Sequence, residues 1–105
     1  MITAIVNFPL DTGTTTEQAK ALFEQSAPRY RSVDGLVRKY YLFNPDTLIA
    51  GGCYLFETRA AADAAFNDEW RALIADRYGA APDIRFFDTP VIVDNSIGNV
   101  ATAAE

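Results

Sequence analysis

The sequence predicts one α+β domain with the element order β-α-β-β-α-β, in which two helices cover one face of a four-stranded antiparallel sheet. Two observations predict this class. Short runs rich in β-branched and aromatic residues alternate with longer stretches in which apolar residues recur every three or four positions. The 105 residues are enough for one compact domain but not for two.

Residues 2–8, "ITAIVNF", are expected to form the first strand because β-branched and aromatic residues dominate them. In the polar loop that follows, Thr14 and Glu17 have the spacing of a capping box and mark the start of the first helix. Apolar residues then recur at helical spacing as far as Tyr30. Pro28 lies inside this helix and should kink or restart it just before the proline.

A β-hairpin is expected next, with strands over residues 36–43 and 48–57 joined by the turn sequence "NPDT". Thr58 directly follows and is a suitable N-cap for the second helix. The apolar residues of this stretch again recur at helical spacing, and Gly79 is a suitable terminator. The pattern therefore predicts one long second helix.

Residues 83–93 are expected to form the last strand, either interrupted or at a sheet edge near Pro90, because proline cannot donate a ladder hydrogen bond. We therefore expect a domain over residues 1–95. The small residues of 96–105 predict a C-terminal tail that is either flexible or packed on a partner.

The element order is the split pattern of ferredoxin-like folds. Two helices cover one sheet face only, yet the later strands carry apolar or aromatic residues at both parities. Adjacent pairs of this kind are Tyr40 and Tyr41, Leu55 and Phe56, and Phe86 and Phe87. A sheet that is apolar on both faces needs a second cover, and the simplest cover is another copy of the chain. The sequence thus predicts a homodimer.

Charge and histidine content limit the function classes. Nine Lys and Arg residues stand against fourteen Asp and Glu, without a basic stripe, which argues against nucleic acid and against an anionic membrane surface as partners. The chain has no histidine, so a His-based catalytic triad, a His-ligated zinc and a His-ligated haem are excluded within one chain. We expect no metal site and no cofactor.

The location of the protein is predicted from three features. Met1 is followed directly by a strand-like run rather than by a basic segment and a long apolar one. No apolar run approaches the roughly 20 residues that span a bilayer. The single cysteine permits no internal disulfide, which suits a reducing compartment. We therefore expect a cytoplasmic protein without a membrane partner.

The stretch "DGLVRKYYLFNPDTLIAGGCYLFET" resembles the small dimeric α/β-barrel proteins of the antibiotic-biosynthesis monooxygenase superfamily, and most closely its putative-monooxygenase subgroup. The likeness lies in the Gly-Leu entry to the strand over 36–43, in Lys39 with an aromatic residue after it, and in "AGGCYLF" before an alanine-rich helix. It extends over roughly residues 1–95.

This resemblance implies that two subunits pair their sheets into a barrel and that each keeps a pocket between its sheet and its helices. Some members oxygenate polycyclic phenols or quinols without metal or flavin, whereas others degrade haem or isomerise lactones. The haem-degrading members use a histidine together with an Asn and a Trp. Asn7 and Trp70 could take the latter two parts, but the missing histidine argues against haem degradation.

Oxygenation without a cofactor needs an apolar pocket, a group that takes a proton, and donors that hold the resulting anion. Trp70 and Asn7 are the catalytic candidates. The indole N–H of Trp70 could donate to a substrate oxygen, or simply to the backbone within the core. The Asn7 amide, between apolar neighbours, could orient a carbonyl or dioxygen, or bond the adjoining loop.

Candidate substrate-binding residues are aromatic or cationic. Strand alternation allows only one of Tyr40 and Tyr41 to face the helices, and likewise only one of Arg38 and Lys39, without deciding which. The cation could stabilise a phenolate, although an exposed ion pair is the commoner role. The full set is Tyr30, Arg38, Lys39, Tyr40, Tyr41, Tyr54 and Phe66.

Three further positions leave alternatives open. Asp88 in "FFDTP" could have a raised pKa and act as a base, or could be a turn residue at a strand edge. Cys53 is expected to be a small buried apolar residue rather than a nucleophile. Gly51 and Gly52 indicate either a β-bulge or close packing against the dimer mate, or else space for a helix or a flat ligand.

The sequence therefore predicts a cofactor-independent monooxygenase that acts on a hydroxylated aromatic or quinol-type small molecule. An isomerase or cyclase on the same scaffold would depend on Asp88 more than on Trp70. A non-enzymatic protein would bind a small aromatic or apolar ligand without turnover. A purely dimer-forming module would fill its pocket with its own aromatic residues.

Overall fold

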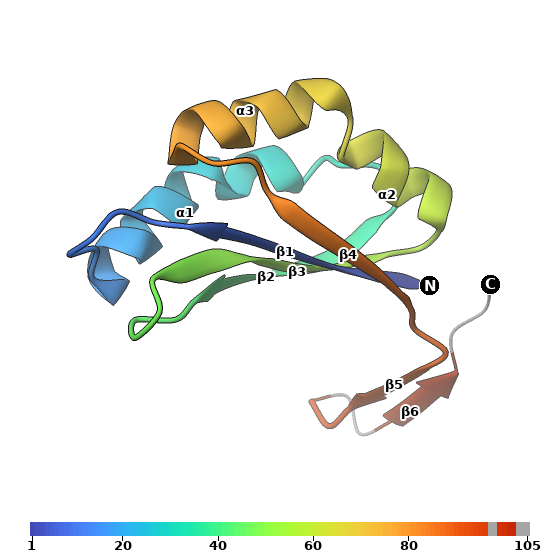
Figure 1. The fold of residues 1–105 in the computed structure, drawn as a ribbon. Helices are drawn as coiled ribbons and strands as arrows, with labels where there is room; N and C mark the ends of the chain where they lie inside the picture. The colour runs from blue at the N-terminus through green and yellow to red at the C-terminus, as the bar shows by residue number, and fades with distance from the viewer. Residues whose placement is uncertain (97–98, 103–105) are drawn as a thin grey trace.

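The computed structural model describes residues 1–96 and 99–102, with side chains for 1–96. Its four-stranded antiparallel sheet has the order β2-β3-β1-β4, and the helices cover one face of it (Figure 1). This confirms the predicted ferredoxin-like α+β class. The elements of this layered body are β1 Ile2–Pro9, α1 Thr16–Tyr30, β2 Leu36–Phe43, β3 Ile49–Phe56, α2 Arg59–Ala65, α3 Asp68–Tyr78 and β4 Asp83–Asp88.

Helix α1 begins one residue later than the capping box over Thr14 and Glu17 predicted. Thr15 is the N-cap: its side chain accepts from the backbone N–H of Gln18, and the Gln18 side chain accepts from the backbone N–H of Thr15. The hydroxyl of Thr14 instead donates to the carbonyl of Asp11 at 2.7 Å. Three consecutive threonines offer the same capping chemistry, so the sequence pattern is right and its position is wrong.

Pro28 does not restart α1, which runs through it as one helix to Tyr30. A proline removes one intrahelical hydrogen bond and crowds the preceding turn, and here only two residues of the helix follow it. The last turn is closed by the backbone N–H of Arg31, which donates to the carbonyl of Pro28 at 3.3 Å. This continuation carries Arg29 and Tyr30 over the sheet.

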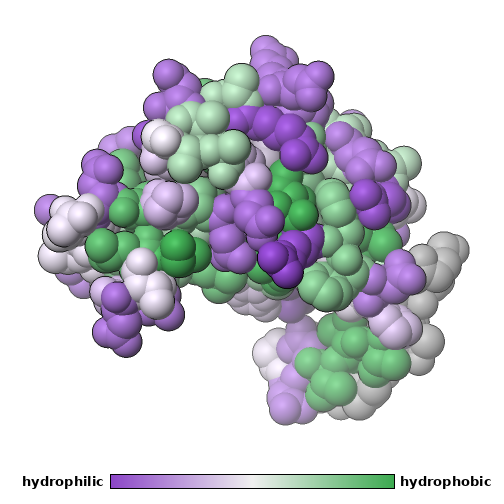
Figure 2. Space-filling model, viewed as in Figure 1, coloured by the Kyte–Doolittle hydropathy of each residue, from purple (hydrophilic) through white to green (hydrophobic). Residues whose placement is uncertain are grey.

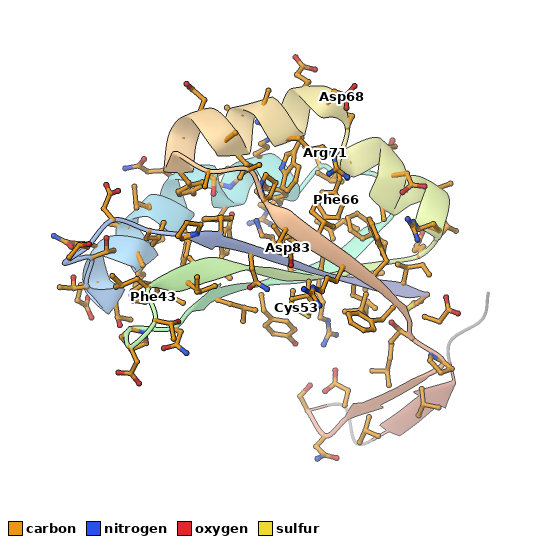
Figure 3. All side chains as sticks on the ribbon, viewed as in Figure 1. Phe43, Cys53, Phe66, Asp68, Arg71 and Asp83 are labelled. Carbon is orange, nitrogen blue, oxygen red and sulfur yellow. The ribbon has the colours of Figure 1, made fainter. Side chains whose placement is uncertain are left out.

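The single long second helix is a wrong prediction, because the chain breaks it at Phe66 and Asn67 into α2 and α3. Asn67 caps α3 by accepting the backbone N–H of Trp70 at 2.8 Å. Arg71 then donates from Nε to the carbonyl of Phe66 at 2.9 Å, which gives the C-cap carbonyl of α2 a hydrogen-bond partner (Figure 3). The break lets the side chains of both Phe66 and Trp70 enter the core, where each is only 3% exposed.

The predicted interruption near Pro90 is confirmed. Strand β4 ends at Asp88, and β5 (Val91–Asp94) leaves the main sheet to pair with β6 (Asn99–Thr102). This hairpin lies on the side of the sheet away from the helices (Figure 1). The domain boundary expected after residue 95 falls at the hairpin turn. Residues 97–98 and 103–105 of the expected tail lie outside the described residues.

Strand alternation divides the sheet into a helix-covered face and an open face. The helix-covered face holds the core, to which β1 contributes Ile2, Ala4, Val6 and Phe8, all buried. On the open face Tyr40 and Phe87 are 54% and 53% exposed. In Figure 3, Phe66 lies between the sheet and the helices, whereas Cys53 lies on the opposite side of the sheet. In Figure 2, hydrophilic residues cover much of the helical layer and hydrophobic ones occupy β5.

The adjacent glycines of β3 form no bulge, because β3 pairs with β1 in continuous register from Ile49 to Phe56. Gly51 has φ +154°, and a Cβ there would lie 1.7 Å from the carbonyl oxygen of Val6. Gly51 is therefore required by the close approach of β1. A Cβ on Gly52 would lie 2.8 Å from the Tyr54 ring and 3.1 Å from Cε of Lys39. The space over Gly52 thus accommodates two side chains of the same chain.

Candidate active site

The aromatic candidates other than Tyr40 line two hollows between the sheet and the helices. A cavity of about 150 Å³, here called the lysine cavity, is lined by residues that include Tyr30, Lys39, Tyr41, Tyr54 and Tyr78. A second hollow of about 300 Å³ shares Tyr30 and Tyr54 with it and extends to Phe66 and Trp70. A more open hollow of about 460 Å³ beside α1 is lined by only one of the candidates, Tyr41.

Lys39 is the cation that β2 directs toward the helices. Its Nζ lies 3.4 Å from the ring centroid of Tyr30, 3.8 Å from that of Tyr41 and 4.6 Å from that of Tyr54. These three rings form a cage from α1, β2 and β3. Within residues 1–96, no carboxylate lies within ion-pair distance of the Lys39 ammonium.

Burial lowers the pKa of Lys39 to about 6, and the positive charge of Arg29 acts in the same direction. The three ring faces favour the ammonium form and oppose this shift. With a pKa near 6, most of the Lys39 side chain is an uncharged amine at neutral pH. Such an amine can accept a proton, which an ordinary surface lysine cannot do at that pH.

The tyrosines around the amine have pKa values shifted in the opposite direction. Burial raises the pKa of Tyr41, Tyr54 and Tyr78 above the ordinary value, and neighbouring Tyr30 adds to the effect on Tyr54. The hydroxyl of Tyr41 is held 2.7 Å from Oγ of Ser26. These phenols keep their protons and act as hydrogen-bond donors. The cavity therefore combines an uncharged amine with neutral hydroxyls.

Trp70 contributes to the site through Tyr30. Its indole Nε1 donates to the Tyr30 hydroxyl at 3.0 Å, and the side chain is 3% exposed. Phe66 packs against the indole with ring centroids 4.6 Å apart. The partner of the indole is thus a side-chain hydroxyl and not the backbone that the core alternative implied. Trp70 fixes the position of the Tyr30 oxygen, which borders both hollows.

Three candidates lie on the open face, away from both hollows. Asn7 alternates with the buried residues of β1 and pairs with Gly51 and Asp83, so the sheet separates it from Trp70. A site within one chain therefore does not bring Asn7 and Trp70 together. Arg38 forms an ion pair with Asp94 of β5 at 3.3 Å and donates to the Tyr40 hydroxyl at 3.2 Å.

Asp88 lies outside the two hollows. Asp88 is exposed at the end of β4 and lines neither hollow, so the apolar surroundings expected from "FFDTP" do not form around its carboxylate. Cys53 is half-buried on the open face, and burial raises the pKa of its thiol. A raised pKa disfavours the thiolate, in agreement with the expected non-nucleophilic role.

Sequence reasoning missed Arg29, Ser26 and Tyr78 as residues of the site. Ser26 and Tyr78 follow the helical spacing of the core faces, so the pattern signals burial without distinguishing core from cavity. Arg29 carried no signal, because only the continuation of α1 past Pro28 brings it over the sheet. All three line the lysine cavity.

The described part of the chain contains neither a metal-binding cluster nor a membrane-spanning helix. Residues 1–96 and 99–102 contain no cluster of three acidic or cysteine side chains that could hold a metal ion. Among the same residues, none of the helices has the length and apolar character needed to cross a bilayer.

The fold and the cavity between sheet and helices define an α+β protein of the architecture found in the antibiotic-biosynthesis monooxygenases. Residues 4–87 match the model of a family described as "Putative mono-oxygenase ydhR", and the chain belongs to this family. A search of curated proteins gives no match.

Three solved structures illustrate the shared fold. A monooxygenase from the gene ActVA-Orf6 of Streptomyces coelicolor, in complex with nanaomycin D, is 19% identical, with TM-score 0.65 over 88% of this chain and 89% of that one. NE2512 of Nitrosomonas europaea, of unknown function, is 19% identical, with TM-score 0.63 and coverage of 84% and 87%. A putative antibiotic biosynthesis monooxygenase of Bordetella bronchiseptica is 17% identical, with TM-score 0.62 and coverage of 84% and 95%.

Proposed function

We propose that the protein is a cofactor-independent monooxygenase that acts on a hydroxylated aromatic or quinol-type small molecule. The observation that carries this proposal is the lysine cavity, which is lined by Lys39 and by four tyrosines. Membership of the putative mono-oxygenase family supports it. So does the fold shared with a monooxygenase that was solved with nanaomycin D.

The reaction needs an electron-rich substrate that can be converted to its anion. The anion reduces dioxygen; one oxygen atom enters the substrate in place of two hydrogens, and the other leaves as water. All electrons then come from the substrate, so the protein supplies only binding, proton transfer and exclusion of water. Once its amine has taken up a proton, Lys39 would hold the anion, since Arg38 lies on the other face of the sheet.

The hydroxyl of Tyr30 is the second polar group of the proposed site. Trp70 donates to its oxygen, which leaves the hydroxyl proton of Tyr30 for another acceptor such as a substrate oxygen. The lysine cavity, at about 150 Å³, corresponds to roughly five water volumes. A substrate of one ring fits this space, whereas a substrate of several fused rings also needs the adjoining hollow beyond Tyr30 and Tyr54.

Oxygen uptake tests the proposal. Metal-stripped protein is mixed with substituted hydroquinones, dihydroxynaphthalenes and anthrols, and products are identified by mass against protein-free autoxidation. We expect uptake above autoxidation, a product with one added oxygen, and loss of uptake in Trp70→Phe and Lys39→Met. Ala72→Glu, at an exposed position of α3, is the matched control and should keep wild-type uptake. Uptake that is equal in all variants would refute the site.

Ligand binding without turnover is the second candidate function. Its readout is Trp70, which lines the larger hollow and is 3% exposed. Saturable quenching of Trp70 fluorescence by the same compounds, without oxygen uptake or product, would establish it. The isomerase alternative depends on Asp88 as its base, and Asp88 is exposed and lines neither hollow.

We also propose that two copies pair through their open sheet faces. The exposed rings of Tyr40 and Phe87 on this face support the pairing, together with the half-buried Ile5, Cys53 and Leu55. Exposed apolar side chains gathered on one face are typical of an association surface.

A further inference from the structure

We propose that Lys39 is the catalytic proton acceptor of the site, and that its amine removes the hydroxyl proton of a phenolic substrate bound in the lysine cavity. This inference rests on the proposed function and deepens it, since it names the group that generates the substrate anion rather than only the charge that holds it. Three observations carry it: the position of the amine, the absence of a rival base, and the ring cage.

The position of the amine is set by β2 and β3. Alternation along β2 directs Lys39 to the helix-covered face, where its side chain passes over Gly52. Nζ then lies 3.4 Å from the ring centroid of Tyr30 and 3.8 Å from that of Tyr41, and all three residues line the cavity. A phenol that enters this cavity therefore meets the amine nitrogen within its walls.

The cavity offers no rival base among the described residues. Every titratable or charged side chain that lines it is a cation or a phenol, and the nearest elements contribute no carboxylate. The Arg guanidinium does not deprotonate in proteins. The groups around Nζ are Arg29 and Tyr30 from α1, Tyr41 from β2, Tyr54 from β3, and Arg77 and Tyr78 from α3.

The proton transfer is balanced and involves no redox change. The lone pair of Nζ takes the hydroxyl proton, and the electron pair of the broken O–H bond stays on the substrate oxygen. An ammonium ion and a phenolate then lie side by side. The faces of Tyr30 and Tyr41 stabilise the new ammonium, and the guanidinium of Arg29 adds positive charge beside the phenolate. The ring cage thus lowers the energy of the product of the transfer.

The first test measures the protonation of Lys39 directly. The chain contains only two lysines, and Lys20 is exposed on α1, so it serves as the internal reference. With ¹³Cε-labelled lysine, the two resonances are followed by NMR from pH 5 to 11. We expect Lys39 to titrate at least two pH units below the ordinary lysine value of 10.5, on the order of the shifts found for buried lysines. Titration of both lysines together would overturn the proposal.

The second test uses 4-nitrophenol, whose absorption spectrum distinguishes the phenol from the phenolate. Bound to the wild type at pH 6.5, the probe should show the phenolate spectrum, with almost no proton released to a weakly buffered solution. Lys39→Met should bind it as the phenol. Lys39→Arg keeps the positive charge but has no basic lone pair, so phenolate binding there should release about one proton per probe molecule.

Proton release separates a proton acceptor from a fixed cation. A wild type that releases one proton per bound phenolate, as Lys39→Arg should, would show that Lys39 is already charged and would overturn the proposal. If the probe does not bind, the NMR titration alone decides. Neither measurement requires oxygen or turnover. Proton transfer to Lys39 without oxygen uptake would therefore reject the monooxygenase and support Lys39 as the base. Oxygen uptake by a protein whose Lys39 titrates as an ordinary lysine would support the monooxygenase and reject Lys39 as the base.

Discussion

The indole N–H of Trp70 donates to the hydroxyl of Tyr30 at 3.0 Å and so joins the start of α3 to the end of α1. Both side chains border the hollow of about 300 Å³, and Tyr30 also borders the lysine cavity. This bond gives the position of the Tyr30 oxygen a second constraint besides the backbone of α1. The pair therefore couples the stability of the helical layer to the geometry of the candidate site.

Removing either partner of this bond should destabilise the protein, and the two effects should not simply add. Tyr30→Phe leaves the buried indole N–H without its acceptor, which should cost about 1–3 kcal/mol of unfolding free energy. Trp70→Phe removes the donor and part of the core packing. Urea unfolding followed by far-ultraviolet circular dichroism measures both, since Trp70 is the only tryptophan. A double-mutant cycle should give a coupling energy of about 0.5 kcal/mol or more. Strict additivity would show that the bond contributes nothing.

Gly51 should tolerate no side chain. In Gly51→Ala the new Cβ would lie 1.7 Å from the carbonyl oxygen of Val6, so β1 and β3 would have to separate. We expect a loss of more than about 3 kcal/mol or failure to fold. Gly13→Ala is the matched control: it also has positive φ, +87°, but nothing lies within 4 Å of its Cβ position. This control should cost only about 1–2 kcal/mol, the strain of the backbone conformation. Equal losses in the two variants would contradict the steric explanation.

Lys39 should make stability depend on pH with a definite sign. Its pKa in the folded chain is about 6 against 10.5 for an ordinary lysine, so between these values the unfolded chain binds a proton that the folded chain does not. The contribution of Lys39 to stability therefore rises with pH through this window and is least favourable below pH 6. Lys39→Met removes this dependence.

The stability gain of Lys39→Met should thus be largest near pH 6 and shrink toward pH 10, by at most about 1.4 kcal/mol per pH unit. Urea unfolding of both proteins at several pH values measures the difference, in which unrelated titrations cancel. Lys20→Met, which removes the other lysine from an exposed position of α1, is the control. A difference in unfolding free energy between Lys39→Met and the wild type that stays constant from pH 6 to 10 would contradict the assignment of a neutral amine.

The open sheet face should carry the predicted homodimer. Tyr40→Glu and Phe87→Glu each place a charge on this face and should shift the protein from dimer to monomer in sedimentation equilibrium. Ala72→Glu adds the same charge at an exposed position on α3 and should leave the dimer intact. A wild type that sediments as a monomer at micromolar concentration would remove the basis for the prediction.

Local patterns predicted most of the fold because they depend on near neighbours. The runs 2–8 and 36–43 became strands, and Thr58 caps a helix as expected. The errors fell where two local solutions had similar energies. Thr14 and Thr15 offer the same capping group. Asn67 can lie within a helix or cap a new one. The cap is favoured because it allows both Phe66 and Trp70 to be buried.

The candidate site was predicted less well, for a geometric reason. The sequence alone determined that Lys39 and Tyr41 share one face of β2 and that Arg38 and Tyr40 share the other, because side chains alternate along any strand. It also determined the absence of histidine and hence the restriction to other bases. Only the tertiary structure decided that Lys39 faces the helices and that Asn7 does not, because the facing parity depends on packing between distant segments. The neutral amine depends on the same packing, since three rings from three elements must meet around one nitrogen to exclude water from it.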